Sequence, residues 1–329
     1  MKNKLLFISA YNSSFVRNDL EILKKHYIVK VPDLVGKKNN LYDLWYSFFS
    51  ILWGVLRSDI VLCWFADFKA YLAISAANLF DKRSFVIVGG YEVANLPEIN
   101  YGGLLNKGNL KRLKYTLSKA TKVFAVSEFS KTEITDLISS TDIKVLYHGL
   151  DLRENKLQKE NLVVTIGNAT EDTYKLKGLE TYIKTSQQFP EYRFIIIGKY
   201  DDDIKQKTLQ MNSNITFTGQ IPQDEAYEWL KKAKVYCQLS LRESFGVALL
   251  EAMNFECIPV VTNRGALPEV VGETGFIVSY DDVEETVNAI RFAIHSDNGS
   301  EARKRVKDNF SLQKRELLLI KEMKGTDET

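Results

Sequence analysis

Short apolar runs of strand length alternate with longer amphipathic stretches along the whole chain. The first series of runs lies at residues 4–9, 28–31, 60–64, 85–88, 123–126 and 144–147. The same rhythm restarts with runs at residues 162–166, 194–197, 215–218, 235–238, 258–261 and 275–278. Alternation of this kind is typical of βαβ units, in which helices join parallel strands. The pattern therefore predicts an α/β chain with two doubly wound parallel sheets.

A polar segment separates the two series of runs. Residues 151–160 are mostly charged and lack an apolar period, which is typical of a link between domains. We expect a first domain over residues 1–152, a second over 153–310, and a C-terminal helix over 311–329 that packs back toward the first domain. Ligands bind beyond the carboxyl ends of strands in open parallel sheets. Two sheets facing a central cleft would therefore suit a transfer between two substrates.

One stretch of the first domain is rich in aromatic residues. Apolar side chains recur there every three to four residues, at Trp45, Phe48, Phe49, Leu52, Trp53 and Leu56. This spacing predicts a helix with one apolar face, which would be buried by packing onto the sheet. Because Tyr46, Ile51 and Val55 add apolar groups away from that face, shallow insertion into a membrane is the alternative.

Composition mainly excludes functions. With 45% apolar and 26% charged residues, the chain has the composition of a folded globular protein. Its three histidines lack metal-ligand spacing, and its three cysteines lie far apart among apolar residues, so we expect buried thiols and no zinc site. The acidic run at residues 201–203 follows a predicted strand and is interpreted as a solvated turn, not as a metal-binding motif.

Charge is distributed unevenly along the chain. The net charge is +2, but residues 1–150 carry 20 Lys and Arg against 13 Asp and Glu. A basic first half would suit an anionic membrane or a phosphate-bearing acceptor, and helix-surface lysines without a target are the alternative. We expect no nucleic-acid partner.

No segment predicts export or membrane spanning. The apolar run at residues 5–10 is shorter than a secretory signal requires, and the longest apolar stretch, residues 44–56, is shorter than a bilayer span. We therefore expect a cytoplasmic chain, with peripheral association at the inner membrane face through its basic, aromatic-rich first domain.

The most informative stretch, residues 242–253, follows a predicted strand and opens a helix. Gly246 lets the backbone approach a ligand closely, and the free N–H groups from Val247 onward suit a diphosphate at the positive end of the helix dipole. Glu251 lies about 6 Å further along the axis, where it could accept hydrogen bonds from ribose hydroxyls. Glu243 precedes the helix and could bind the transferred sugar while balancing positive character at its anomeric carbon. The alternative is that both acids only favour the helix dipole.

The spacing of Glu243 and Glu251, with Ser-Phe-Gly after the first glutamate, resembles the E-x7-E motif of retaining glycosyltransferases of family four. The segments that follow in the order typical of that family are residues 257–261, 265–272 and 275–278. The resemblance covers roughly residues 160–290. It implies the GT-B fold, in which two Rossmann-like doubly wound parallel-sheet domains face a central cleft. It also implies a nucleotide-sugar donor in the second domain, with neither a metal ion nor a cofactor.

A lysine upstream resembles another feature of that family. Gly167 ends a predicted strand, and Lys177-Gly178 follows in the position of the family's lysine–glycine helix start. The resemblance implies that Lys177 stabilises the charge of the departing diphosphate. Relatives usually have arginine directly after the strand glycine, whereas this chain has Asn168, so either another cation replaces it or turnover is reduced. The candidates for that replacement are Lys175, Arg242 and Arg264.

The resemblance assigns a full set of site residues. The donor-binding positions are Gly167, Asn168, Lys177, Gly219, Ile221, Glu243, Ser244, Phe245, Gly246, Val247 and Glu251. The catalytic positions are Glu243, Lys177 and Glu92.

The first domain resembles the family more weakly. Gly89, Gly90 and Glu92 follow a predicted strand, where relatives place a cleft Asp or His near the acceptor. Glu92 could orient the acceptor hydroxyl or help remove its proton, and a structural hydrogen-bonding role has equal weight. Arg17 could reach a phosphate or the acceptor, or it could simply begin a helix.

The resemblance implies a retaining, metal-independent hexosyltransferase. It would move a sugar from a UDP- or GDP-linked donor to a glycan or a lipid-linked acceptor. Two alternatives stay open. One is another enzyme on the same architecture, such as a sugar-nucleotide epimerase, and the other is a non-catalytic GT-B subunit, which the replacement at Asn168 would mark.

Overall fold

A computed structural model gives the fold. The residues that it describes are 2–9, 13–32, 41–138, 141–154, 157–212 and 214–324, without the side chains of 41–44. Two residues of the expected link, 155 and 156, and the end of the expected C-terminal helix, 325–329, lie outside this set. The chain divides into two compact units, which we call unit 1 (residues 1–148 and 313–329) and unit 2 (residues 149–312).

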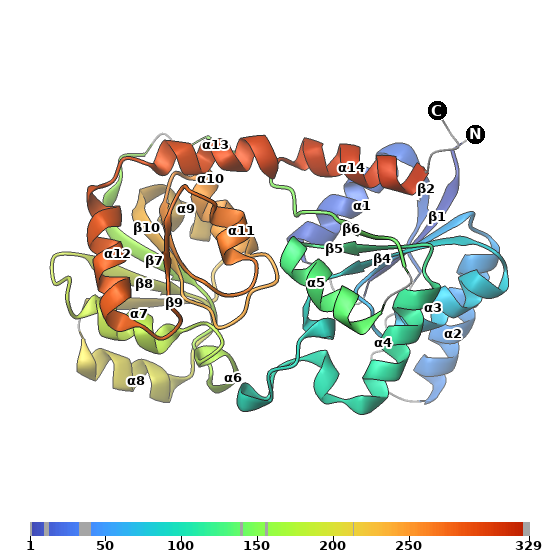
Figure 1. Cartoon of the computed structure of the whole chain (residues 1–329), viewed down its shortest axis with the longest axis horizontal. Coiled ribbons are helices and arrows are strands. Elements are labelled where there is room, and N and C mark those ends of the chain that lie inside the picture. Colours follow the sequence, from blue (N-terminus) through green and yellow to red (C-terminus); the bar gives the residue numbers. More distant parts are fainter. Residues whose placement is uncertain are drawn as a thin grey trace. The chain divides into compact units, whose positions relative to one another are not determined.

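Unit 1 is built on a six-stranded parallel sheet with the strand order β2-β1-β3-β4-β5-β6. Its strands are β1 (Lys4–Ser9), β2 (Ile28–Lys30), β3 (Ile60–Trp64), β4 (Arg83–Val88), β5 (Lys122–Ala125) and β6 (Ile143–Val145). Its helices are α1 (Ser14–His26), α2 (Leu41–Leu56), α3 (Phe68–Leu79), α4 (Lys107–Lys119), α5 (Glu128–Leu137) and α14 (Leu312–Lys324, from residue 313 onward). Three short 3-10 turns, η1 (Tyr91–Val93), η2 (Pro97–Ile99) and η3 (Gly103–Leu105), lie between β4 and α4 (Figure 1).

Helices cover both faces of this sheet because its strands are apolar on both sides. Alternate strand residues such as Leu6, Val61 and Val86 form one core with α2, α3 and α4. Residues of the opposite parity, such as Phe7 and Phe85, are equally buried. Burial on both faces is typical of parallel sheets and explains the continuous apolar runs of the sequence.

The aromatic helix α2 presents the opposite face to the sheet from the one that we expected. Ile51 and Val55 are buried in the core, whereas Trp45, Phe49 and Trp53 are exposed. The expectation that the aromatic face packs onto the sheet was therefore wrong. Both sides of this helix are apolar, and the smaller β-branched side chains are the ones that fit against the sheet.

Unit 2 contains a second six-stranded parallel sheet, with the strand order β12-β11-β10-β7-β8-β9. Its strands are β7 (Glu160–Ile166), β8 (Arg193–Ile197), β9 (Ile215–Gly219), β10 (Ala233–Gln238), β11 (Ile258–Thr262) and β12 (Phe276–Val278). Its helices are α6 (Glu171–Tyr174), α7 (Leu179–Ser186), α8 (Asp202–Met211), α9 (Gln223–Lys232), α10 (Val247–Asn254), α11 (Leu267–Val271), α12 (Val283–His295) and α13 (Gly299–Asn309). Helices α7 and α12 pack onto one face of the sheet, through Leu179, Tyr182 and Ile290.

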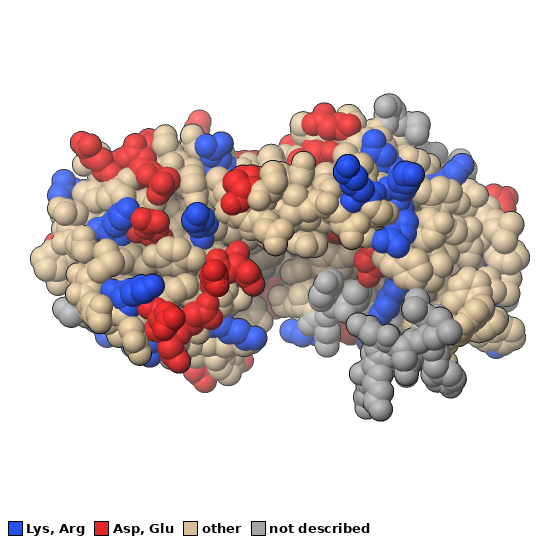
Figure 2. Space-filling model, turned by 90° about the horizontal axis from the view of Figure 1, so that it is seen from below, with Lys and Arg blue, Asp and Glu red and all other residues tan. Residues whose placement is uncertain are grey.

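Both sheets agree with the sequence prediction. The ends of all twelve strands lie within two residues of the predicted runs. Acidic side chains gather on the face of unit 2 seen in Figure 2, and several Lys and Arg side chains group on unit 1. Among the described residues, no helix combines the length and the apolar character needed to cross a bilayer.

Candidate functional site

The strand order of unit 2 locates a ligand site. Counted from β7, the order is 3-2-1-4-5-6, which reverses between β7 and β10. Sheets of this kind bind ligands at the carboxyl ends of the two strands that flank the reversal. The residues that follow β7 and β10 in the sequence, Gly167 to Lys177 and Leu239 to Gly246, are therefore the ones placed at the switch point.

A lysine–glutamate pair lies at this point. The Nζ atom of Lys177 lies 3.0 Å from Oε2 of Glu243, and the Nε2 atom of Gln238 donates to the same oxygen at 2.7 Å. Gln238 is itself oriented by the buried Tyr236, whose hydroxyl donates to Oε1 of Gln238. Lys177 and Glu243 are each about one-quarter exposed, so both are accessible to a ligand. The structure thus brings together two predicted residues that are 66 positions apart.

Two glycines fix the loop that carries Glu243. Gly246 is the N-cap of α10 and has a φ of +99°, in the left-handed region that favours glycine. Gly265 has a φ of +61°, and a Cβ atom there would lie 2.1 Å from the carbonyl oxygen of Glu243. The next residue, Ala266, donates its N–H to that carbonyl at 2.9 Å. The backbone of Glu243 is therefore held between β10 and the loop after β11.

Glu251 lies one turn inside α10 and already has partners. Its Oε1 atom accepts hydrogen bonds from Nε2 of Gln223 at 2.6 Å and from the hydroxyl of Tyr227 at 3.0 Å. Burial raises the pKa of Glu251, and these two hydrogen bonds oppose the rise. The carboxylate therefore faces the first turns of α9, which the loop at Ile221 leads into.

The other predicted donor residues are distributed around this loop system. Gly167 lies against the side chain of Lys177, and Gly219 accepts a hydrogen bond from the N–H of Gly198. Asn168 uses its side-chain oxygen to accept the N–H of Lys199 at 3.0 Å, so it fixes a loop. Of the residues beside Gly246, Ser244 bonds to Arg242, Phe245 is buried against Phe310, and Val247 begins α10.

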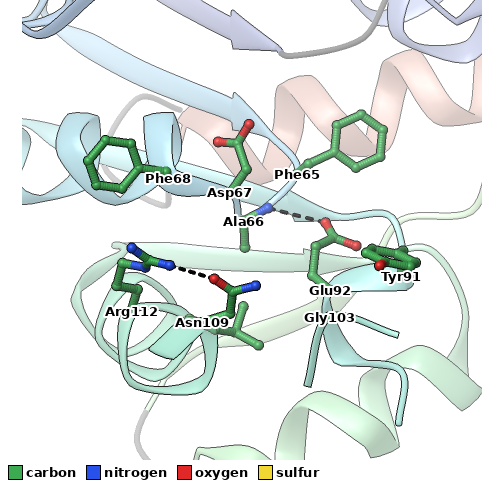
Figure 3. Close-up of a pocket in the computed structure, with 10 residues that line it drawn as sticks. Phe65, Ala66, Asp67, Phe68, Tyr91, Glu92, Gly103, Asn109 and Arg112 are labelled. Carbon is green, nitrogen blue, oxygen red and sulfur yellow. Dashed lines mark hydrogen bonds between the residues drawn. The ribbon is translucent and has the colours of Figure 1, made fainter. Parts of the chain in front are cut away.

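Unit 1 contains a separate pocket of about 290 Å³ (Figure 3). It lies where the segments after β3 and β4 meet the first turns of α4. Its apolar walls are formed mainly by Phe65, Phe68, Tyr91 and Leu113, and its polar side chains are Asp67, Glu92, Asn109 and Arg112. Arg112 donates to Asn109 and lies over the ring of Phe68. Aromatic rings beside carboxylate, amide and guanidinium groups can bind a ligand that has both apolar faces and hydroxyls.

Glu92 holds the floor of this pocket together. Its Oε1 atom accepts the N–H groups of Ala66 and Gly89, and its Oε2 atom accepts that of Gly90. Burial raises the pKa of Glu92, while these backbone hydrogen bonds favour its ionised form. The neighbouring Phe65 has a φ of +71°, an uncommon value for a bulky residue. The carboxylate of Glu92 therefore joins the loops after β3 and β4.

The remaining predicted acceptor residue lies elsewhere. Arg17 is exposed in the first turn of α1 and is not among the residues that line the pocket. Sequence reasoning missed Phe65, Asp67 and Arg112, although the position of Phe65 and Asp67 directly after β3 is a signal that could have found them. It also missed Gln238, a polar residue that ends an otherwise apolar strand.

We expect Glu92→Gln to destabilise unit 1 by about 1–3 kcal/mol. The amide nitrogen that replaces one carboxylate oxygen cannot accept a hydrogen bond, so at least one backbone N–H at the pocket floor loses its partner. Urea unfolding followed by circular dichroism measures the change. The matched control is Glu98→Gln, because Glu98 lies exposed in the next turn, η2. Unchanged stability of Glu92→Gln would contradict the structural role of this carboxylate.

The described residues contain no group of three or more His, Cys, Asp or Glu side chains placed to hold a metal ion. The acidic run is the N-terminus of α8, where Asp201 accepts the N–H of Glu171. Cys63, Cys237 and Cys257 are buried free thiols, as the sequence predicted.

Comparisons with known proteins agree with this geometry. Residues 150–311 match the family model of glycosyl transferases group 1. A sulfoquinovosyl transferase of Arabidopsis thaliana is 32% identical over 36% of this chain and 24% of its own length. The GDP-mannose:cellobiosyl-diphosphopolyprenol alpha-mannosyltransferase of Xanthomonas oryzae is 21% identical over 56% of this chain and 52% of its own. The chain thus matches about half or less of the length of these two relatives.

A solved structure resembles the whole chain. HepE from Anabaena, in complex with UDP-glucose, superposes with a TM-score of 0.77 at 16% identity, over 98% of this chain and 99% of that one. The fold is therefore GT-B, as the sequence predicted. The comparisons support membership of the glycosyl transferases group 1 family, and the family match lies within unit 2.

Proposed function

We propose that the chain is a retaining glycosyltransferase that binds a UDP- or GDP-sugar in unit 2. The observation that carries this proposal is the Lys177–Glu243 pair at the carboxyl ends of β7 and β10, beside the N-terminus of α10. Support for the donor class comes from HepE, which binds UDP-glucose, and from the relative named for GDP-mannose.

Each group of the donor site has a separate task in this proposal. The N–H groups that open α10 and the ammonium of Lys177 bind the diphosphate without a metal ion. Glu243 hydrogen-bonds the sugar and offsets positive charge at its anomeric carbon. Glu251 receives the ribose hydroxyls, which share the carboxylate with Gln223 and Tyr227.

Transfer then exchanges one bond at the anomeric carbon for another. The bond to the diphosphate oxygen breaks as the acceptor oxygen attacks from the same side. The acceptor proton passes to the leaving phosphate, so no separate base is needed. Lys177 stabilises the negative charge that develops on the diphosphate. Exclusion of water from the site prevents hydrolysis of the donor.

The acceptor is assigned to the unit 1 pocket. Its rings, Phe65, Phe68 and Tyr91, suit the apolar face of a sugar, and Asp67 and Arg112 suit its hydroxyls. We propose a glycan or a lipid-linked glycan as the acceptor, and a place of action at the cytoplasmic face of a membrane. The diphosphopolyprenol named in one relative supports the lipid-linked class.

One observation favours a second candidate, a non-catalytic subunit that keeps the GT-B fold. Asn168 is committed to the loop at Lys199 and supplies no cation to the diphosphate. Lys175 and Arg264 are both exposed and are the candidate replacements, and Arg264 directly precedes Gly265, which lies against the backbone of Glu243. Sugar transfer by the isolated chain separates the transferase from both the subunit and an epimerase.

The donor site is tested by nucleotide binding. We expect UDP or GDP to raise the unfolding temperature of the chain. At a nucleotide concentration of 100 times the Kd, the free energy of unfolding should increase by about 2.7 kcal/mol. Lys177→Met should weaken this binding about 10- to 100-fold, because a hydrogen bond between charged groups contributes about 1.5–3 kcal/mol. A thermal-shift assay measures the stabilisation, and isothermal titration calorimetry measures the affinity.

The control for that experiment is Lys184→Met, which removes an exposed lysine of α7 that pairs with Glu180. Its affinity for the nucleotide should equal that of the wild type. If Lys177→Met binds the nucleotide as tightly as this control, the diphosphate lies elsewhere. If neither UDP nor GDP binds at millimolar concentration, the proposed donor class is wrong.

A further inference from the structure

The outer side of α2 forms a continuous aromatic surface. Six exposed side chains form this surface, which we call the α2 aromatic face: Trp45, Tyr46, Phe48, Phe49, Trp53 and Leu56. They are 39% to 62% exposed. The rings contact one another: the centroids of Trp45 and Phe49 are 5.9 Å apart, and those of Phe48 and Phe49 are 5.5 Å apart. Contiguous exposed apolar surface of this kind marks an interaction site.

The α2 aromatic face is not needed to hold the helix in place. Ile51 and Val55 on the inner side are buried in the core of unit 1. Gly54 lets the helix lie close to β1, since a Cβ atom there would come within 2.7 Å of the Leu6 side chain. The inner side therefore accounts for the packing of α2, and the six outer side chains remain available to a partner.

The charges around this face indicate the kind of partner that it binds. Residues 44–58 contain no acidic residue, Asp43 and Asp59 flank them, and residues 1–150 as a whole carry 20 Lys and Arg against 13 Asp and Glu. The guanidinium of Arg57 lies 5.0 Å from the ring centroid of Trp53. Lys30 and Val31, at the end of β2, line the same shallow pocket as Trp53 and Arg57. Val31 is itself 55% exposed and extends the apolar surface. Apolar rings bordered by cations are complementary to an anionic lipid surface.

The chemistry of the rings favours a bilayer over a second protein. Trp and Tyr combine an apolar ring with a polar tip, and this combination is enriched at the headgroup level of membranes. The face is the outside of a single helix, so it can lie flat in the interface without a complementary groove.

We propose that the α2 aromatic face docks the chain onto a bilayer that carries anionic headgroups. The rings enter the interface, while Arg57 and Lys30 contact lipid phosphates. This inference rests on the proposed work of the transferase at a membrane, and it names the surface that brings the enzyme there. Docking itself requires no sugar transfer and can be measured separately.

The test uses the full chain and vesicles of two compositions. We expect it to co-sediment with mixed phosphatidylcholine and phosphatidylglycerol vesicles, more weakly with phosphatidylcholine alone, and less at high salt. Brominated lipid tails should quench its tryptophan fluorescence. The double substitution Phe49→Ser with Trp53→Ser should lower the vesicle partition coefficient on the order of tenfold or more, because binding scales with the apolar area inserted.

The matched control is Phe292→Ser, which removes an exposed ring from unit 2. It should bind vesicles as the wild type does. Circular dichroism should show that the double variant is folded, since its two substituted side chains are exposed. Equal vesicle binding by the double variant and the wild type would overturn the proposal, as would absence of binding by the wild type.

Two further outcomes distinguish membrane docking from dimer formation and from sugar transfer. A dimer that the double substitution dissociates, without vesicle binding by the wild type, would assign the face to a second copy and overturn the proposal. Transfer to a water-soluble acceptor should be equal in the wild type and the double variant. A chain that binds vesicles through this face but transfers no sugar would contradict the proposed function and support the docking surface.

Discussion

Glu243→Gln is expected to lower the rate of sugar transfer by about 10²–10³-fold, the usual effect of removing one group that stabilises developing charge. The amide has almost the same shape as the carboxylate, so the loop between β10 and α10 should keep its conformation. What is lost is the negative charge beside the anomeric carbon. Single-turnover kinetics with the donor bound at saturation measures this step apart from binding.

Nucleotide affinity makes this prediction sharper. In the structure the ammonium of Lys177 lies 3.0 Å from the carboxylate of Glu243. The substitution releases Lys177 to the diphosphate, so affinity for the nucleotide should stay the same or increase. The matched control is Glu273→Gln, since Glu273 is exposed in the loop after α11. Unchanged turnover by Glu243→Gln would remove Glu243 from the mechanism.

The fold was predictable because each strand can be recognised from a short stretch of the sequence. The inner strands of a parallel sheet are buried on both sides, so they stand out as short apolar runs such as residues 60–64 or 258–261. The order of the strands within each sheet could not be predicted from such short stretches. It depends on which runs pair across the sheet, as β7 does with β10 more than sixty residues later.

The orientation of α2 shows a limit of periodicity. A spacing of three to four residues identifies side chains that share a face, but it does not say which of two apolar faces meets the sheet. The aromatic face carries the larger side chains, yet Ile51 and Val55 are the residues that join the same core as Leu6. The size of the side chains accounts for this orientation, because a helix that lies close to the sheet has room for small branched side chains and not for indole rings.

The candidate site was predictable only where a motif places residues. Lys177 and Glu243 were found by resemblance, and the structure adds the hydrogen bond between them. The partners of Glu251, Gln223 and Tyr227, come from another helix and carry no motif. The same holds for Arg112 in the unit 1 pocket. Such contacts arise from tertiary packing, which a single sequence does not display.

Arg315→Met is expected to destabilise unit 1 by about 3–5 kcal/mol, because it leaves a buried charge without its partner. Arg315 lies in α14, and its guanidinium forms two hydrogen bonds with Asp19 of α1, at 2.6 and 2.7 Å. The side chains of Arg315 and Asp19 are 2% and 0% exposed. The guanidinium also donates to the carbonyl oxygens of Leu146 and Tyr147, which follow β6. Arg315 therefore links α14 both to α1 and to the segment after β6.

Urea unfolding measures this loss, with Lys321→Met as the control, because Lys321 is an exposed cation on the same helix. The control should unfold within about 0.5 kcal/mol of the wild type. The double variant Asp19→Leu with Arg315→Met should regain part of the stability, since it buries no unpaired charge, although Trp64 then loses the acceptor of its indole N–H. If Arg315→Met unfolds like the control, the ion pair does not hold α14 to unit 1, and the C-terminal helix must be retained by its other contacts, such as the buried Leu319 and Met323 and the ion pair of Glu322 with Lys122.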